Sequence, residues 1–324
     1  MDDSADSGDA TDADIGDTDR RNPSASSTGS TSSGESSPFP SARGERRTEP
    51  SIETDETKLD ATDLVLQYPG GETPVIDGAL IAIARNTVTA LIGPNGSGKS
   101  TLLRGLADQL SAQDGQVLLD RRAVDELPDR ALARELGLLS QEPTSPGALS
   151  VEELAYHGRY PHRGFFELVD DADVRAVERT LSLTGIKALR DRPLSDLSGG
   201  QRRLAWLAMT LAQDTDVLLL DEPTTFLDLR HQLAVMDVVE TLRAESDRTV
   251  VLVLHDVEQA ARYAEEIVVL YDGEIRTRGT PEEVVTEGLL ASVFGVEAIV
   301  EGSERGPRVT PLRPVADAGR NATD

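Results

Sequence analysis

The sequence predicts an α/β fold with a mostly parallel sheet at its centre, a small antiparallel region before it and an inserted helical lobe. Three observations lead to this prediction. A glycine-rich loop at residues 93–101 follows a strand-like apolar run and precedes a helix-like one. The apolar runs 217–220 and 249–254 end in polar side chains, as parallel strands do at the ligand-binding edge of a sheet. Residues 150–185 have helical periodicity, which places the lobe at about residues 144–204.

Composition excludes several classes of protein. The 324 residues include no cysteine, so disulfides, thiolate metal sites and cysteine nucleophiles are excluded. The longest apolar runs, such as 250–254, are far shorter than the roughly 20 residues that span a bilayer, so an integral membrane protein is not expected. The formal charge is −26, and lysine occurs only at Lys58, Lys99 and Lys187. No basic stripe is available for nucleic acid, so no nucleic-acid partner is expected.

The acidic residues are dispersed along the whole chain. A surface for a basic partner is one interpretation, and adaptation to concentrated salt, which screens self-repulsion, is the favoured one.

Both ends of the chain differ from its middle. Residues 1–57 are rich in Asp, Ser, Thr and Gly, with Phe39 as their only aromatic residue, and cannot bury enough apolar surface to fold. We therefore predict a disordered acidic tail there. Residues 303–324 are polar and rich in Pro, Arg and Gly, which predicts a flexible C-terminal tail. The folded domain is expected at residues 58–302.

The folded part begins with strands. Residues 64–68 and 75–84 are strand-like and flank a Pro-Gly-Gly turn. Tyr68 stands at the end of the first strand. Its ring is a candidate to stack on a nucleotide base, and an ordinary half-buried strand tyrosine is the alternative.

Residues 93–101, GPNGSGKST, give the first chemical signal. The glycines let the backbone wrap around phosphate oxygens, so that its N–H groups and the following helix N-terminus point at the anion. Lys99 can reach the β- and γ-phosphates, and the Ser100 hydroxyl can ligate Mg²⁺. The full pattern between a strand and a helix predicts ATP or GTP binding. The predicted contact residues are Gly93, Pro94, Asn95, Gly96, Ser97, Gly98, Lys99, Ser100 and Thr101.

Two strands and the helical lobe follow. Residues 116–120 form one predicted strand, and 136–141 form another that ends at Gln141, whose side chain could reach Mg²⁺ if its strand lies beside the loop. Ser150 and Glu153 predict a helix capping box. One apolar helix face is predicted at Val174, Val177, Leu181 and Ile186.

Residues 217–222, VLLLDE, give the second chemical signal. The pattern places Asp221 at the metal and Glu222 where it can polarise an attacking water. It is common by chance alone, but with the glycine loop it completes a Mg²⁺ nucleotide site. His255 follows the next strand, where it could contact the γ-phosphate or order the water beside Glu222. Asp256 suits a helix cap better.

The C-terminal part has a hairpin and helix signal. Asp272-Gly273 predicts a tight turn between strands at 267–271 and 274–278. Thr280 and Pro281 then suit the cap and first position of a helix.

A third segment completes a recognisable order. Leu197, Ser198, Gly199, Gly200 and Gln201, the LSGGQ segment, precede a helix predicted at 202–213. Together with the glycine loop, Gln141, VLLLDEPT, Leu227-Asp228 and His255, it resembles the nucleotide-binding domain of an ABC ATPase over about residues 59–300. The resemblance implies a P-loop NTPase fold with a RecA-like core, an antiparallel β subdomain and an inserted helical subdomain.

The resemblance also implies roles. Tyr68 would stack on adenine, Lys99 would hold phosphates, Glu222 would be the general base and His255 the γ-phosphate sensor. The Mg²⁺ shell would include Ser100, Gln141 and Asp221. The cofactors implied are ATP and Mg²⁺.

The LSGGQ segment would act in trans. It would complete the site of an opposing subunit, so that two ATP molecules are sandwiched in a head-to-tail homodimer, with Asp228 communicating across the dimer.

A narrower resemblance is to the ATPases of iron-siderophore, haem and cobalamin importers. Phe226 is informative, because many ABC ATPases have a small or polar residue there. Arg203-Leu204 and Ser140 depart from this subgroup, which often has Gln-Arg and proline there, and neither is expected to touch the chemistry. The segments that carry the resemblance are 158–162, 205–209, 223–232 and 293–296.

The implied partners follow from a single ATPase domain without a membrane span. The chain would act as a homodimer on separate integral membrane permease subunits, peripheral to the cytoplasmic face of the cell membrane, with an external substrate-binding protein involved indirectly. The docking surface would lie at about residues 144–160.

Three alternatives remain. An ABC ATPase of iron-sulfur assembly, or one of an export system, is disfavoured by residues 224–228. A role in DNA repair or translation is disfavoured because the sequence has neither the long coiled coil of repair ATPases nor the tandem domains of translation factors. A non-catalytic nucleotide sensor is disfavoured by the presence of Lys99, Glu222 and His255.

Overall fold

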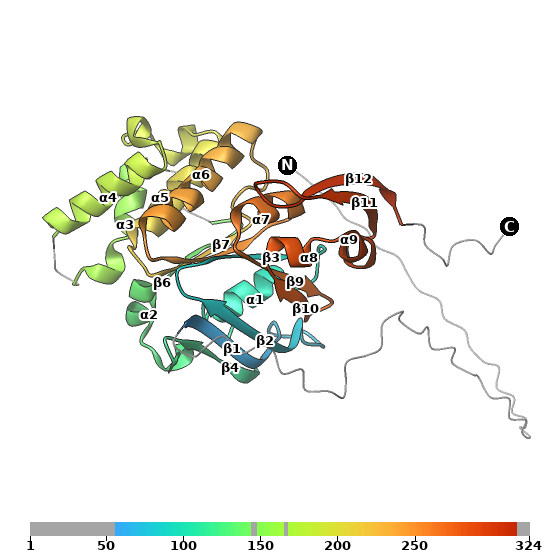
Figure 1. Cartoon of the computed structure of the whole chain (residues 1–324). Helices are drawn as coiled ribbons and strands as arrows, with labels where there is room; N and C mark the ends of the chain where they lie inside the picture. The colour runs from blue at the N-terminus through green and yellow to red at the C-terminus, as the bar shows by residue number, and fades with distance from the viewer. Residues whose placement is uncertain (1–55, 144–147, 165–167, 316–324) are drawn as a thin grey trace, which may run out of the picture. The chain divides into compact units, whose positions relative to one another are not determined.

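The computed structural model describes residues 56–143, 148–164 and 168–315 (Figure 1). The predicted N-terminal tail lies outside these residues except for Glu56 and Thr57, and the first strand already begins at Thr57. No helix among these three described ranges has the length and apolarity to cross a membrane.

The strands are β1 (Thr57–Leu66), β2 (Ile76–Ala84), β3 (Val88–Ile92), β4 (Asp114–Leu119), β5 (Arg122–Ala123), β6 (Leu136–Leu139), β7 (Val217–Asp221), β8 (Thr249–Val253), β9 (Glu266–Tyr271), β10 (Glu274–Gly279), β11 (Val296–Glu301) and β12 (Arg308–Pro314). The α-helices are α1 (Lys99–Leu106), α2 (Asp129–Glu135), α3 (Val151–His157), α4 (Asp171–Leu183), α5 (Gly199–Ala212), α6 (Leu229–Glu245), α7 (Val257–Tyr263), α8 (Pro281–Val284) and α9 (Glu287–Val293). Short 3₁₀ turns occupy Val124–Glu126, Tyr160–His162, Lys187–Leu189 and Leu194–Asp196.

The central sheet has six strands in the order β10-β9-β3-β8-β7-β6. All neighbouring pairs are parallel except β9 with β10, which confirms the prediction of a mostly parallel sheet. The residues of β3, β7 and β8 are buried throughout, because helices or a second sheet cover both faces. The carboxyl ends of β3, β8, β7 and β6 therefore meet at one edge.

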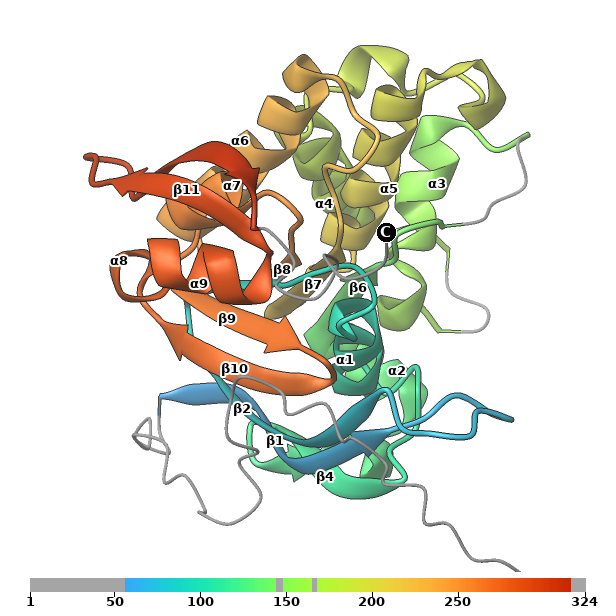
Figure 2. The same ribbon diagram turned by 90° about the vertical axis from the view of Figure 1, so that its right-hand side faces the viewer.

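A four-stranded antiparallel sheet, ordered β2-β1-β4-β5, confirms the antiparallel region predicted before the glycine loop. Helix α1 lies between the two sheets (Figures 1 and 2). Its Leu102, Leu103 and Leu106 are fully buried. Burial of a leucine contributes about 1.5–3 kcal/mol, so this layer anchors the loop that precedes α1.

The helical lobe consists of α3, α4 and α5, which lie together away from the antiparallel sheet (Figure 1). The predicted capping box is confirmed: the Glu153 N–H donates to Ser150 Oγ at 3.2 Å, and the Ser150 N–H donates to Glu153 Oε2 at 2.8 Å.

The predicted apolar face of α4 is wrong at one position. Val177 and Leu181 are buried, but Val174 is 40% exposed. Asp173 is buried instead, because it forms an ion pair with the buried Arg159 at 2.9 Å. The inward face therefore keeps Val177 and Leu181 but has Asp173 in place of Val174 in the first turn.

The C-terminal prediction needs a correction. The Asp272-Gly273 hairpin is confirmed, and both residues have positive φ as a tight turn requires. Residues 303–315, however, are not a loose tail: β12 pairs antiparallel with β11. The side chains of Val300 and Val309 pack against the main core, which stabilises this second hairpin. Residues 316–324 lie outside the described part.

Candidate functional site

A cavity of about 680 Å³ opens at the edge where the strands β3, β6, β7 and β8 end. Its lining includes the glycine loop and most of the predicted site residues from the other strands. The lining residues are Val75, Asn95, Gly96, Gly98, Lys99, Ser100, Thr101, Gln141, Glu222, Thr225, Phe226 and His255.

The glycines of the loop serve two different purposes. Gly96 has φ +79°, and a Cβ placed there would meet nothing within 4 Å, so the backbone is open on that side. A Cβ on Gly93 would lie 2.0 Å from the Leu270 carbonyl oxygen, and one on Gly98 would lie 2.7 Å from Ile76. Close packing against β9 and β2 therefore requires glycine at these two positions, in addition to the room that a bound phosphate needs.

Lys99 is the first residue of α1 and is 5% exposed. Its ammonium donates to the carbonyl oxygens of Gly93 at 2.9 Å and Pro94 at 2.8 Å. Burial lowers the pKa of this ammonium, and the carboxylates of Glu222 and Asp221 partly oppose the effect. The Lys99 side chain thus folds back over its own loop, and its ammonium group is within reach of an anion in the cavity.

Oxygen atoms gather beside this lysine. The Ser100 hydroxyl donates to Asp221 Oδ1 at 2.7 Å. Asp221 is 1% exposed, and burial raises its pKa while the bond from Ser100 lowers it. A hydroxyl and a carboxylate with no nitrogen or sulfur are hard ligands, and Mg²⁺ is usually bound by one or two carboxylates plus phosphate oxygens. In the same loop, the buried Ser97 Oγ has no hydrogen-bond partner among the described residues. The residues therefore fit Mg²⁺ and a phosphate chain.

Glu222 is 8% exposed and is contacted by three side chains. Gln141 Nε2 donates to its Oε2 at 2.8 Å, and Thr225 Oγ1 donates to the same atom at 3.1 Å. His255 Nε2 lies 2.5 Å from Oε1. Sequence reasoning missed Thr225, whose only signal was its place in the turn after Glu222.

Gln141 is expected to reach Mg²⁺ only if its strand lies beside the glycine loop. This condition is not met, because β8 and β7 separate β6 from β3, the strand that precedes the loop. Gln141 reaches the cavity by another route, since β6 pairs with β7 and so brings it to Glu222.

Tyr68 lies two residues beyond the end of β1 and is 38% exposed. Its hydroxyl lies 3.3 Å from the Thr101 hydroxyl and accepts from Arg104 at 3.4 Å. The ring is thus held beside the first turn of α1 but does not line the cavity.

The LSGGQ segment lies elsewhere, at the start of α5. The helix begins at Gly199, three residues before the predicted start, and Ser198 is its N-cap. The Gln201 N–H donates to Ser198 Oγ at 3.3 Å, and the Ser198 N–H donates to Gln201 Oε1 at 3.2 Å. None of its residues lines the cavity. Leu197 is 6% exposed and packs in the core, so within this segment its contribution is structural.

Asp228 caps α6 in a similar way. Its Oδ1 accepts from the His231 N–H at 2.9 Å, and the carboxylate is largely exposed. A Cβ on Gly200 would lie 2.3 Å from the His231 ring, so the Asp228–His231 pair packs tightly on the LSGGQ segment.

Arg203 makes contacts that the sequence pattern did not predict. Arg203 is buried under the cavity, and its guanidinium donates to the Ser140 carbonyl at 2.7 Å and to the Asp221 carbonyl at 2.7 Å. The available signal was its spacing, because Arg203, Leu207 and Leu211 share one buried face of α5 whereas Arg202 is exposed.

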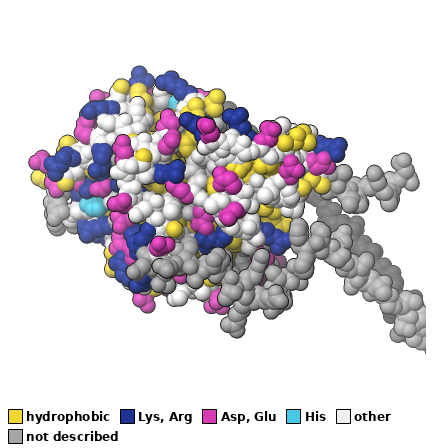
Figure 3. Space-filling view, in the orientation of Figure 1, with side chains coloured by type: hydrophobic (Ala, Val, Ile, Leu, Met, Phe, Trp, Pro, Cys, Tyr) yellow, Lys and Arg dark blue, Asp and Glu magenta, His cyan; other side chains and the backbone are white. Residues whose placement is uncertain are grey.

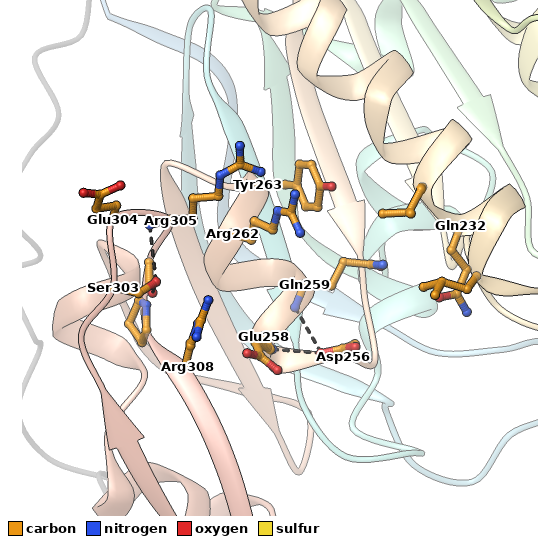
Figure 4. Close-up of a pocket in the computed structure, with 14 residues that line it drawn as sticks. Gln232, Asp256, Glu258, Gln259, Arg262, Tyr263, Ser303, Glu304, Arg305 and Arg308 are labelled. Carbon is orange, nitrogen blue, oxygen red and sulfur yellow. Dashed lines mark hydrogen bonds between the residues drawn. The ribbon is translucent and has the colours of Figure 1, made fainter.

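A second cavity, of about 810 Å³, lies between α6, α7 and the loop before β12. Figure 4 shows Arg262 and Arg305 near Tyr263 on one side of it, and Asp256 and Glu258 on another. Asp256 accepts from the N–H groups at the start of α7, which confirms it as a cap. This cavity contains none of the predicted nucleotide-binding residues.

The family model described as ABC transporter matches residues 76–225 of the chain. The chain is 44% identical over 239 residues to the petrobactin import ATP-binding protein FpuD of Bacillus anthracis, covering 74% of this chain and 87% of the relative. It is 40% identical over 267 residues to the ferric enterobactin transport ATP-binding protein FepC of Escherichia coli, covering 82% and 98%. It is 34% identical over 266 residues to the cobalamin import ATP-binding protein BtuD of Halobacterium salinarum, covering 82% and 66%.

Solved structures agree on the fold. The dimeric structure of MJ0796, described as a bacterial ABC transporter cassette, superposes with a TM-score of 0.62 at 25% identity. The match covers 68% of this chain and 98% of that one.

Proposed function

The chain belongs to the ABC transporter family, and from this premise we propose that it is the ATP-hydrolysing subunit of an importer for an iron-siderophore, haem or cobalamin-type compound. The ATP-binding cassettes of this family are ATPases that power transport. The observation that carries the proposal is the convergence of Lys99, Ser100 and Glu222 on one cavity, with Asp221 accepting a hydrogen bond from the Ser100 hydroxyl. The names of the relatives support import and the cargo class.

The chain's own residues perform distinct steps. The loop amides and Lys99 bind the phosphates, and Lys99 exchanges the Gly93 and Pro94 carbonyls for the β- and γ-phosphate oxygens. Ser100 and Asp221, with Gln141 nearby, would hold Mg²⁺, which would neutralise phosphate charge. Tyr68 stacks on adenine at the far end of the nucleotide.

Glu222 accepts a proton from the attacking water. Its carboxylate already accepts from Gln141 and Thr225 and lies against His255, so it is held in one orientation. His255 is 40% exposed towards the cavity and can donate to the γ-phosphate once that group arrives. The general base and the phosphate-sensing side chain are therefore coupled by direct contact.

The LSGGQ segment acts in trans in a head-to-tail homodimer. Ser198 and the N–H groups at the start of α5 form a phosphate cradle distant from this chain's own cavity lining. Asp228 lies beside this segment, and the dimeric structure of MJ0796 supports a dimer.

The dimer works on separate permease subunits at the cytoplasmic face of the membrane, with an external binding protein delivering the cargo. The docking surface comprises about residues 144–160, of which 144–147 lie outside the described residues and the others include α3. The dispersed charge supports adaptation to concentrated salt: Asp and Glu side chains are scattered among Lys and Arg over the face in Figure 3. Export or a transport-independent role is the alternative, and the import names of the relatives count against it.

The proposal is tested by trapping the complex. Glu222→Gln carrying an affinity tag is incubated with ATP in high potassium chloride and purified from solubilised membranes. We expect a polytopic permease to co-purify, since the variant holds ATP without completing turnover. Recovery of soluble partners alone, with a permease absent under conditions where the variant binds ATP, would favour a transport-independent ATPase.

The domain boundaries lead to a second expectation. Deletion of residues 1–55 removes no residue of the cavity, so ATP hydrolysis should stay within about twofold of the full chain. A steady-state phosphate-release assay on both proteins at equal concentration measures this. A tenfold loss would give the N-terminal segment a role in the catalytic cycle.

A further inference from the structure

The guanidinium of Arg203 has one carbonyl oxygen for each of its N–H donors. An arginine side chain presents five N–H donors in a rigid planar fork. The acceptors are the carbonyl oxygens of Pro223 (from Nε, 3.3 Å), Ser140 and Gln141 (from Nη1, 2.7 and 2.9 Å), and Asp221 and Glu222 (from Nη2, 2.7 and 3.1 Å).

This arrangement compensates a buried charge. Arg203 is 8% exposed, and within the described part of the chain its hydrogen-bond acceptors are backbone carbonyls and no carboxylate. Burial lowers the pKa of its guanidinium to about 10, and the negative charges of Asp221 and Glu222 limit this fall. The side chain therefore stays protonated at neutral pH. A buried cation is tolerated when hydrogen bonds replace its water. A lysine, with three donors, cannot satisfy five carbonyl oxygens in this geometry.

The five carbonyls belong to two segments that carry the chemistry. One segment follows β6 and contains Gln141; the other ends β7 and contains Glu222. Glu222 has φ +48°, a left-handed conformation that is unfavourable for any residue with a Cβ. Such conformations persist only where the surroundings hold them. The Arg203 guanidinium donates hydrogen bonds to the carbonyl oxygens on both sides of the Glu222 Cα, those of Asp221 and of Glu222 itself.

We infer that Arg203 is a positioning residue for hydrolysis. It fixes the Glu222 and Gln141 segments against each other and so aims the carboxylate at the cavity. Arg203 lies on α5, which begins within the LSGGQ segment. Its side chain therefore also links that segment to the backbone of the general base, Glu222. This inference rests on the proposed ATPase function and adds a residue to which the sequence pattern assigned no role.

The test compares Arg203→Lys with Arg202→Lys, a matched control on the exposed side of the same helix turn. ATP affinity and turnover per bound nucleotide are measured for both variants and the original chain. We expect Arg203→Lys to lower kcat at least about tenfold, since a displacement of the base by about 1 Å can cost far more than that. ATP affinity should change less than about threefold, because Arg203 makes no hydrogen bond to the glycine loop. Arg202→Lys should change neither quantity.

Folding is monitored separately. Trp206, the chain's single tryptophan, lies on α5 about one turn after Arg203, so its fluorescence reports the local fold. Arg203→Met serves as the second variant, because it removes the buried charge, and with it the cost of leaving a cation unpaired, and has no N–H group to donate to the carbonyls. It should also lower turnover per bound nucleotide with ATP affinity retained.

Three results would overturn the inference. Unchanged turnover per bound nucleotide in both Arg203 variants would do so, as would a fall matched by an equal loss of ATP-binding sites, which marks a purely structural role. An equal fall in Arg202→Lys would show that the effect is not specific to the five-carbonyl contact. Failure of the original chain to hydrolyse ATP would instead contradict the proposed function itself.

Discussion

Glu222→Gln should reduce ATP hydrolysis by at least about 100-fold while ATP binding is retained. The amide has nearly the shape of the carboxylate but cannot take a proton from the attacking water. Binding should persist because the loop and Lys99 are unchanged, and Lys99 donates to loop carbonyls and not to Glu222. Steady-state phosphate release and equilibrium binding of a fluorescent ATP analogue measure the two effects.

The same variant should accumulate as a dimer in ATP, because hydrolysis would no longer separate the subunits. Size-exclusion chromatography with light scattering, with and without ATP, detects this. Glu282→Gln is the matched control, since Glu282 is an exposed carboxylate on α8, distant in sequence from every cavity residue. Hydrolysis by Glu222→Gln at the original rate would remove Glu222 from the role of general base.

Lys99→Ala should weaken ATP binding by about 10- to 100-fold. Hydrogen bonds to a charged group contribute about 1.5–3 kcal/mol each, and this lysine is the cation placed at the phosphates. The change in affinity should be larger for ATP than for AMP, which lacks the β- and γ-phosphates. Competition binding with ATP and with AMP measures the difference.

Lys187→Ala controls for the loss of a positive charge. Lys187 is 55% exposed and pairs with Glu178 at 2.7 Å on the lobe, so its removal should cost little. Equal affinity of Lys99→Ala and the original chain for ATP would contradict the phosphate-loop assignment. A loss that is the same for ATP and AMP would place the lysine's effect away from the β- and γ-phosphates.

Tertiary structure brought together groups that the sequence could only rank as candidates. Gln141, Glu222 and His255 follow three different strands, and their contacts at 2.8 and 2.5 Å depend on the order β8-β7-β6. Strand order arises from packing between segments distant in sequence, and no local pattern encodes it. Gln141 was therefore identified as a site residue for a reason that proved wrong, adjacency to the glycine loop.

Errors of local prediction have a similar origin. Val174 fits the helical period, but Asp173 is buried in its place because Arg159, from another segment, supplies the opposite charge. Residues 308–314 contain two arginines and two prolines and are expected to be loose, yet β11 provides their backbone partners. Val309 and Leu312 do not follow the two-residue alternation of a strand, so only its partner identifies it.

The sequence by itself determined the chemistry: the glycine loop, Asp221-Glu222 and His255 each stand directly after an apolar strand, and this local order predicts both the parallel sheet and the nucleotide site. Tertiary structure alone decided how that chemistry is held in place. Arg203 is one of many arginines in the sequence, and nothing local distinguishes it from exposed Arg202 except its face of the helix. Its five carbonyl partners come from two separate strand ends, so the contact exists only once the sheet and α5 have packed together.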